Sequence, residues 1–214
     1  ACGEFGEGKM TEPKNIENFL ISFFGKIHNN KQLKALVTAG PTQELIDPVR
    51  FLSNKSSGKQ GYEIAKSLRD NGFNTTLIAG PTKLKDLENI NLIKVNSGFE
   101  MMEQVKKNLP SDVAILSAAV SDFIPDIKSD QKIKKNEKEI NLKLKRNIDI
   151  LDYISKHNSL RPKLVIGFAA ETQSLEENSK KKLLNKNCDW IIGNDVSNSN
   201  IGFDSDYNEV SIYY

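Results

Sequence analysis

Residues 35–41 read ALVTAGP, a short apolar run that ends in a Gly-Pro turn, and this pattern predicts a strand. Residues 75–81, TTLIAGP, repeat the pattern. Between the two runs, residues 58–71 carry apolar side chains at helical spacing, and Gly72 follows where a helix commonly ends. A strand, a helix and a second strand in this order form a right-handed βαβ unit, so this stretch predicts a parallel sheet.

The same alternation continues along the chain. Further strands are expected at residues 92–95, 112–118, 163–170, 189–193 and 210–214, and further helices at residues 98–109, 148–157 and 175–187. Residues 128–146 are charged and partly alternating, which predicts an exposed hairpin that we call the flap. The predicted fold class is therefore α/β, with a doubly wound, mostly parallel, Rossmann-like sheet and a charged flap hairpin. Ligands of such sheets bind beyond the carboxyl ends of the strands.

Composition narrows the classes of function. The chain has 214 residues, a formal net charge of +2 and two cysteines. A charge this close to zero argues against a dedicated nucleic-acid-binding protein. The apolar runs are no longer than a strand, so we expect no membrane span. Few cysteines and no signal peptide favour the cytoplasm. Residues 1–32 differ in character from residues 33–214, so we expect a fragment of a longer protein, with its main domain at 33–214.

The connection after the first strand, residues 41–58, is far longer than most strand-to-helix loops. It ends in Ser56, Ser57 and Gly58, whose hydroxyl and N–H groups suit either a helix cap or a cradle for phosphate or carboxylate, and the two roles are compatible. The connection lacks both the Walker A spacing and the G-x-G-x-x-G pattern of dinucleotide-binding turns.

Other candidate residues lie at expected strand ends, on a helix and on the flap. Asp122 suits either a free carboxylate at the sheet edge or a turn cap. Phe168 suits either stacking on a flat base or packing in the core. Lys182 and Lys186 are one helical turn apart and can reach one target together. The lysine run that begins at Lys132 suits either a triphosphate clamp or a solvated face.

Five segments appear in a specific order. They are residues 54–59 (NKSSGK), 118–123 (AAVSDF), 132–135 (KIKK), 167–172 (GFAAET) and 194–196 (NDV). Together they strongly resemble the phosphopantothenate–cysteine ligase family, in the bacterial form that is the C-terminal half of a bifunctional protein. Residues 1–13 resemble the last substrate loop of the fused decarboxylase half, with Lys9 where that family has Arg. The resemblance implies that residues 1–32 are a decarboxylase remnant and linker, that Cys2 matches its proton donor, and that FMN belongs only to the missing part.

The resemblance also implies a reaction. The carboxylate of 4′-phosphopantothenate attacks the α-phosphorus of CTP, which releases pyrophosphate and leaves an acyl-cytidylate. The amine of L-cysteine then displaces CMP and forms the amide. The family uses Mg²⁺ and is a homodimer in which the flap reaches the partner subunit. We therefore expect these small molecules, a second copy and the fused decarboxylase domain as partners, with no nucleic acid and no membrane.

The roles of individual residues follow from the same resemblance. Asn54 is similar to the residue that polarises the acyl carbonyl in the second step, and Lys132 to a lysine needed for the first. The implied nucleotide contacts are Asp122, Lys132, Ile148, Asp149, Ile150, Leu151, Phe168, Lys182 and Lys186. The family often has Pro where this chain has Ile148. Ser56, Ser57 and Gly58 are the implied substrate-binding residues, and no metal ligand is assigned.

Two alternatives use the same fold. An NAD(P)-dependent reductase would need a dinucleotide fingerprint, which the chain lacks. A non-catalytic nucleotide- or RNA-binding module would draw on the basic flap, but no aromatic side chains interleave its lysines as a stacking platform requires.

Overall fold

The structure is a computed structural model, and it describes residues 32–134, 139–197 and 208–214. The chain divides into two compact units, Ala1–Gln32 and Leu33–Tyr214, and the description below concerns the second. The interpretation of residues 1–32 as a decarboxylase remnant, with Cys2 as its proton donor, lies outside the described residues.

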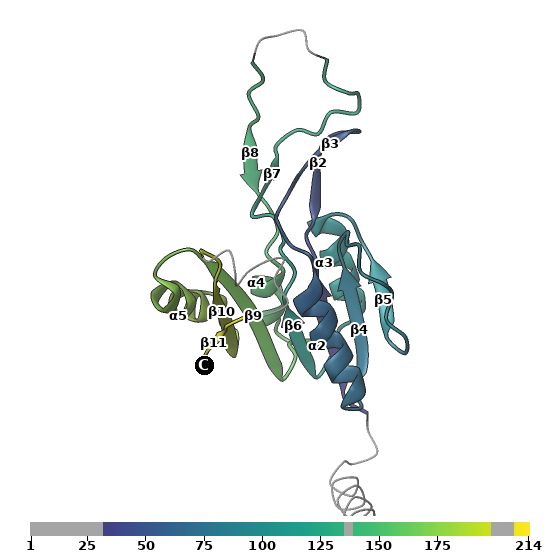
Figure 1. The fold of residues 1–214 in the computed structure, drawn as a ribbon, viewed down its shortest axis with the longest axis vertical. Coiled ribbons are helices and arrows are strands. Elements are labelled where there is room, and N and C mark those ends of the chain that lie inside the picture. Colours follow the sequence, from purple (N-terminus) through teal and green to yellow (C-terminus); the bar gives the residue numbers. More distant parts are fainter. Residues whose placement is uncertain (1–31, 135–138, 198–207) are drawn as a thin grey trace, which may run out of the picture. The chain divides into compact units, whose positions relative to one another are not determined.

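Seven strands form one sheet, in the order β11-β10-β9-β6-β1-β4-β5 (Figure 1). They are β1 (Lys34–Ala39), β4 (Asn74–Ala79), β5 (Asn91–Lys94), β6 (Val113–Leu116), β9 (Leu164–Glu171), β10 (Trp190–Asp195) and β11 (Ser211–Tyr213). All neighbouring pairs are parallel except β10 and β11. The chain starts at β1, extends through β4 and β5 on one side, and returns to β6, β9 and β10 on the other. The predicted doubly wound fold is confirmed, and its direction reverses between β1 and β6.

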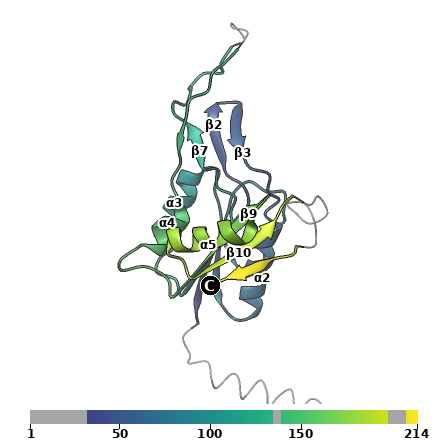
Figure 2. The same ribbon diagram turned by 90° about the vertical axis from the view of Figure 1, so that its left-hand side faces the viewer.

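Helices cover both faces of the sheet (Figure 2). They are α2 (Lys59–Asp70) on one face, and α3 (Gly98–Lys107), α4 (Ile150–Ser155) and α5 (Leu175–Lys186) on the other. Among the described residues, no helix combines the length and the apolar character needed to cross a bilayer.

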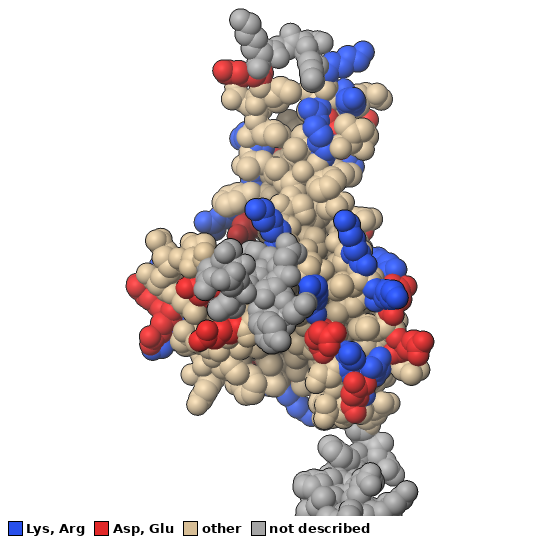
Figure 3. All heavy atoms as spheres, in the orientation of Figure 1, with Lys and Arg blue, Asp and Glu red and all other residues tan. Residues whose placement is uncertain are grey.

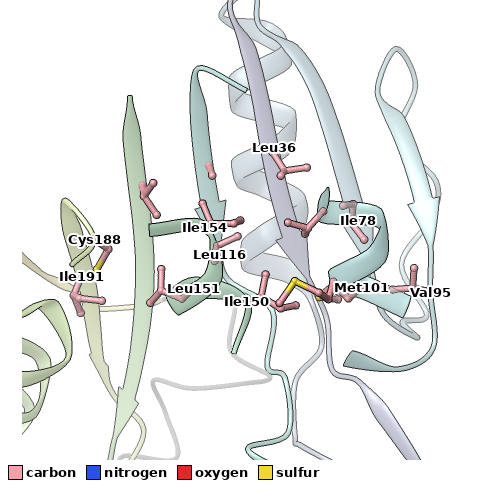
Figure 4. Close-up of a cluster of buried hydrophobic side chains, with 14 of the residues drawn as sticks. Leu36, Ile78, Val95, Met101, Leu116, Ile150, Leu151, Ile154, Cys188 and Ile191 are labelled. Atoms are coloured by element: carbon pink, nitrogen blue, oxygen red, sulfur yellow. The ribbon is translucent and has the colours of Figure 1, made fainter. Parts of the chain in front are cut away.

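Alternation along the strands produces two buried clusters, because successive side chains point to opposite faces of a sheet. Val37 packs with Tyr62 of α2 in one cluster. Leu36 belongs to the other cluster, with Met101 of α3 and Ile154 of α4 (Figure 4). The second cluster therefore fixes α4 against the sheet, beside the carboxyl end of β6.

Two of the helices that start near the sheet's carboxyl edge, α3 and α2, begin differently. Ser97 caps α3, since its Oγ accepts a hydrogen bond of 3.2 Å from the backbone N–H three residues on. The N-cap of α2 is Gly58, with φ of 80° and no side-chain cap bond. A Cβ at this position would lie 2.7 Å from the side chain of Thr82. Glycine is therefore required here by both backbone angle and packing, and neither Ser56 nor Ser57 is the N-cap residue.

Two hairpins project beyond the sheet and form what we call the arm, which among the described residues comprises 43–53, 123–134 and 139–146 (Figures 1 and 2). They are made by β2 (Gln43–Asp47) with β3 (Arg50–Ser53), and β7 (Phe123–Pro125) with β8 (Leu144–Arg146). The first corrects the expectation of a plain loop over residues 41–58. The second carries the predicted flap, and three residue pairs nearest the sheet form its ladder in the described part of the hairpin.

Asp47 explains why the first hairpin forms and how the flap is attached to it. Its side chain is fully buried. One carboxylate oxygen accepts hydrogen bonds from the N–H groups of Val49 and Arg50, which closes the turn. The other accepts from the Arg50 guanidinium and from the Ile133 N–H at 3.1 Å. Arg50 also donates to the Ile133 carbonyl at 2.9 Å, so both backbone groups of this flap residue are bound.

This network changes the acidity of Asp47. The hydrogen bond from Arg50 holds the pKa of the Asp47 carboxyl well below its ordinary value. Burial acts in the opposite direction, and the N–H groups of Val49, Ile133 and Arg50 add to the lowering. The contribution of the carboxylate to stability is therefore present above the unfolded-state pKa and is lost only as the pH falls through the lowered value.

We predict that Asp47→Asn loosens the flap, because the neutral amide cannot replace all the bonds that the carboxylate accepts. Trypsin cleavage after Lys132 and Lys134 should become about tenfold faster at neutral pH. Asp130→Asn makes the same charge change on the exposed surface of the flap and should cleave like the wild type. Equal cleavage rates for all three proteins would contradict the attachment described above.

Candidate functional site

A cavity of about 610 Å³ lies at the carboxyl ends of β6 and β9, between the start of α4 and one side of α5. The structure brings eight of the sequence-predicted nucleotide contacts into its lining. They are Asp122, Ile148, Asp149, Ile150, Leu151, Phe168, Lys182 and Lys186. A second cavity, of about 300 Å³, lies at the opposite edge of the sheet, around the start of β1, and contains none of the predicted residues. The larger cavity is therefore the candidate site.

The wall formed by α4 depends on Asp149. Its carboxylate caps the helix by accepting from the Asp152 N–H at 2.8 Å, and it pairs with the Lys186 ammonium at 2.6 Å. Burial acts to raise the pKa of the Asp149 carboxyl, but these two bonds and the charges of Lys186 and Lys182 lower it overall. Ile150 and Leu151 are buried in the core next to the cap. Asp149 is thus an ionised group with a fixed direction at the cavity edge.

The two predicted lysines of α5 both have partners in this structure. Lys182 Nζ donates to the Phe168 carbonyl at 2.7 Å, and Lys186 pairs with Asp149. Burial acts to lower the pKa of Lys186, but its hydrogen bond to Asp149 and the charges of Asp149, Asp152 and Asp122 raise it overall. Both ammonium groups can turn from these protein acceptors to the oxygens of an anionic ligand.

The charges that line the cavity balance. Its basic residues are Arg146, Lys182 and Lys186, and its acidic residues are Asp122, Asp149 and Asp152. Three positive and three negative groups give a net charge of zero before a ligand enters. A polyphosphate would therefore need additional positive charge from outside this lining.

Asn54 lies directly behind the cavity wall, at the end of β3. Its Nδ2 donates to the carbonyls of Ala119 and Val120, each at 3.3 Å. These bonds are longer than the usual 2.9–3.0 Å, so they are weak and can be exchanged for another acceptor. Val120 lines the cavity. Asn54 is not a lining residue itself, but it contacts Val120, which is.

The remaining predicted residues lie elsewhere within the subunit. Ser56, Ser57 and Gly58 are at the entry of α2 and outside the cavity lining, where Gly58 packs against Gly40. Lys132 is exposed on the arm, beside the Ile133 that Asp47 and Arg50 hold. Figure 3 shows Lys and Arg side chains on this arm, above the sheet.

Lys132 and Asn54 therefore do not face one cavity within a single chain. Arg50, at the turn of the first hairpin, holds the neighbour of Lys132, and Asn54 follows the hairpin at its base. The four residue steps from Arg50 to Asn54 correspond to about 13 Å of extended strand. Lys132 and Asn54 are therefore apart within one chain.

Sequence reasoning missed several groups that build the site. Thr42 is fully buried, and its Oγ1 accepts from the Ser121 N–H at 3.2 Å. Glu44 is buried near the start of α3. Asn147 donates to the Ser121 carbonyl at 2.8 Å. Residues 42–47, TQELID, show no apolar–polar alternation, so no local signal marked Thr42 and Glu44 as buried, and the long connection that holds them was interpreted as a loop.

The donor set does not fit a resident metal. In the part of the chain that the structure describes, no group of three His, Cys, Asp or Glu side chains is arranged to hold an ion. Asp149 and Asp152, the nearest pair of carboxylates, are already bound to Lys186 and to the α4 backbone. Mg²⁺ is therefore considered below only as part of a metal–nucleotide substrate.

Comparison with known proteins shows the family of the chain. A family model, the DNA/pantothenate metabolism flavoprotein C-terminal domain, matches residues 30–214. The coenzyme A biosynthesis bifunctional protein CoaBC of Haemophilus influenzae is 41% identical over 215 residues, covering 100% of this chain and 53% of that protein. The corresponding protein of Bacillus subtilis is 40% identical over 219 residues, with the same coverage. The chain spans about half the length of these curated relatives.

A solved structure agrees as well. The crystal structure of the C-terminal domain of a CoaBC protein has a TM-score of 0.70 and 37% identity, and the match covers 87% of this chain and 84% of that one. The family resemblance predicted from the five sequence segments is thus confirmed: the chain belongs to the DNA/pantothenate metabolism flavoprotein C-terminal domain family, which includes the C-terminal domain of CoaBC.

Proposed function

We propose that this domain is a phosphopantothenate–cysteine ligase that uses CTP and acts in coenzyme A biosynthesis. The observation that carries the proposal is the 610 Å³ cavity, which collects eight implied nucleotide contacts from four segments of the chain. Family membership with CoaBC relatives supports the same reaction. The cytoplasmic location expected from the sequence stays a prediction.

In the first step, the phosphopantothenate carboxylate attacks the α-phosphorus of CTP, and pyrophosphate leaves. Two anions must approach each other, so positive charge has to be concentrated near the phosphates. Lys182 and Lys186 line the cavity and can exchange their present acceptors for ligand oxygens. The lining is neutral overall, so further positive charge is needed to stabilise the phosphates. Lys132 supplies part of it, and the Mg²⁺ that enters bound to the triphosphate supplies the rest.

In the second step, the cysteine amine attacks the carbonyl of the acyl-cytidylate and CMP leaves. An uncharged donor next to the carbonyl oxygen stabilises the tetrahedral species that forms. Asn54 has the right chemistry, and its two 3.3 Å bonds to Ala119 and Val120 leave it exchangeable. These contacts place its amide one residue from the cavity lining, which supports a role in this step.

The arm supports assembly with a second copy of the chain. It exposes an apolar set, which consists of Leu45, Val49, Phe51, Phe123, Ile127, Ile140, Leu142 and Leu144. Such a concentration of exposed apolar side chains is typical of an interface. Lys132 lies on this same arm and away from the cavity of its own subunit. A homodimer through the arm would cover the apolar set and carry Lys132 to the cavity of the partner.

A reductase is the weaker alternative. The connection after β1 is the β2–β3 hairpin, and the described residues there show no glycine-rich turn against which a dinucleotide pyrophosphate could lie. No observation favours a non-catalytic module over an enzyme.

The reaction is tested by two variants that should fail at different steps. Lys132→Ala is expected to lower pyrophosphate release from CTP and phosphopantothenate by about a hundredfold or more. Asn54→Ala should still release pyrophosphate but form amide at least about a hundredfold more slowly, because the carbonyl loses its donor. Pyrophosphate and CMP are measured separately, with and without cysteine. Lys143→Ala, a flap lysine paired with Asp126, serves as the control.

Identical behaviour of the Lys132 and Asn54 variants would contradict the division of roles. Absence of cysteine-dependent CMP from the wild-type domain would contradict the ligase itself, and ATP supporting the reaction as well as CTP would contradict the nucleotide choice.

The assembly is tested by Phe51→Asp, which puts a charge into the exposed apolar set of the arm. We expect the wild type to sediment as a dimer and this variant as a folded monomer with little pyrophosphate release. Leu184→Asp makes the same change at an exposed leucine of α5, outside that set, and should remain dimeric. A wild-type monomer at micromolar concentration, with full activity, would refute the two-chain site.

A further inference from the structure

The wall of the nucleotide cavity is built from two segments that are far apart in the sequence. Residues 118–122 follow β6, and residues 146–149 precede α4, and both line the cavity. Asn147 joins them. Its Nδ2 donates to the Ser121 carbonyl and its backbone N–H to the Asp122 carbonyl, each at 2.8 Å. Its Oδ1 accepts from the Ile148 N–H, also at 2.8 Å, so one side chain contacts both segments.

Glu44 contacts Asn147 from outside the cavity lining. It lies on β2, is only 7% exposed and is outside the cavity lining. Its Oε1 accepts a 2.9 Å hydrogen bond from the Gly98 N–H, at the first residue of α3, and a 3.5 Å bond from Asn147 Nδ2. A carboxylate near a helix N-terminus is stabilised by the helix dipole.

The surroundings allow one orientation of the Asn147 amide. Its Nδ2 faces two acceptors, the Ser121 carbonyl and the Glu44 carboxylate, and its Oδ1 faces a donor, the Ile148 N–H. Turning the amide over would set oxygen against oxygen on one side and N–H against N–H on the other. The packing is also close, because a Cβ on Gly98 would lie 2.9 Å from Asn147 Nδ2 and 3.2 Å from Glu44 Oε1.

We propose that Asn147 is a positioning residue for nucleotide binding and that Glu44 holds it in place. Asn147 fixes the distance between Asp122, on one segment, and the Asp149–Lys186 pair, on the other. The inference rests on the proposed function of the cavity and adds two residues that the sequence interpretation left without a role. Glu44 acts only through Asn147 and through the start of α3.

A positioning role has a kinetic signature. The wall is assembled before the nucleotide binds, so a defect in it weakens binding equally in the ground state and in the transition state. The KM for CTP should therefore rise while kcat changes little. A residue that contacted the reacting phosphorus would lower kcat instead.

The main experiment is a calorimetric titration of the full domain with Mg–CTP. Asn147→Asp keeps the shape of the side chain but sets an oxygen against both Ser121 and Glu44, so we expect CTP affinity to fall about tenfold or more. Asn71→Asp is the matched control. Its Nδ2 donates to the Ser67 carbonyl at 2.8 Å at the exposed end of α2, and affinity should stay at the wild-type value.

Glu44 provides the second arm of the experiment. Glu44→Gln keeps an acceptor for Gly98 and Asn147 and should bind CTP within about threefold of the wild type. Glu44→Ala leaves both N–H groups without that acceptor and should bind more weakly than Glu44→Gln. In the double variant, the Gln amide can donate to the new Asp oxygen, so Glu44→Gln should recover part of the affinity lost in Asn147→Asp.

The outcomes distinguish a failure of the positioning role of Asn147 from a failure of the proposed function. Wild-type affinity in Asn147→Asp, or additive effects in the double variant, would overturn the positioning role. A wild-type domain that binds no CTP would overturn the proposed function beneath it. If Asn147→Asp does not fold, as judged by circular dichroism, Asn147→Ala is titrated instead, and unchanged affinity there overturns the inference in the same way.

Discussion

The backbone of residues 119–122, where the chain leaves β6, is hydrogen-bonded from three directions, and the position of the cavity depends on this. From the β1 side, the Gly40 carbonyl accepts from the Ala119 N–H at 2.9 Å, and Thr42 bonds to Ala119 and Ser121. From β3, Asn54 donates to two carbonyls, and from the start of α4, Asn147 donates to two more. Backbone polar groups that leave a sheet need partners. Here the backbone segment that these partners hold lines the cavity, together with Asn147.

Within one subunit, the two side chains proposed for the two reaction steps, Asn54 and Lys132, lie in different places. Asn54 directly follows β3 and lies next to the cavity. Asp47 and Arg50 instead bind the flap at the far end of the first hairpin. One subunit therefore has a cavity of zero net lining charge, and its Lys132 is exposed on the arm, outside that lining. In the proposed homodimer, a single contact surface would cover the apolar arm and supply the missing cation.

Local patterns predicted the sheet and the helices because each depends on neighbouring residues. Apolar runs marked the buried strands, and apolar side chains at helical spacing marked α2. The β2–β3 hairpin was missed because its turn depends on Asp47, whose burial is stabilised by Ile133, 86 residues away. An Asp-Pro pair between Leu45 and Phe51 was a usable signal for that turn. The nucleotide contacts came from family resemblance, whereas Glu44 and Asn147 show their roles only through long-range hydrogen bonds.

The central claim is that the cavity between β6, α4 and α5 takes the nucleotide of an activated acid. A crystal structure of the domain with CTP and Mg²⁺ tests it most directly. We expect the cytidine in the 610 Å³ cavity, beside Asp122 and Lys186, and the triphosphate directed toward the flap of the partner subunit. Nucleotide bound only at the opposite edge of the sheet, or only at Ser56 and Gly58, would contradict the account.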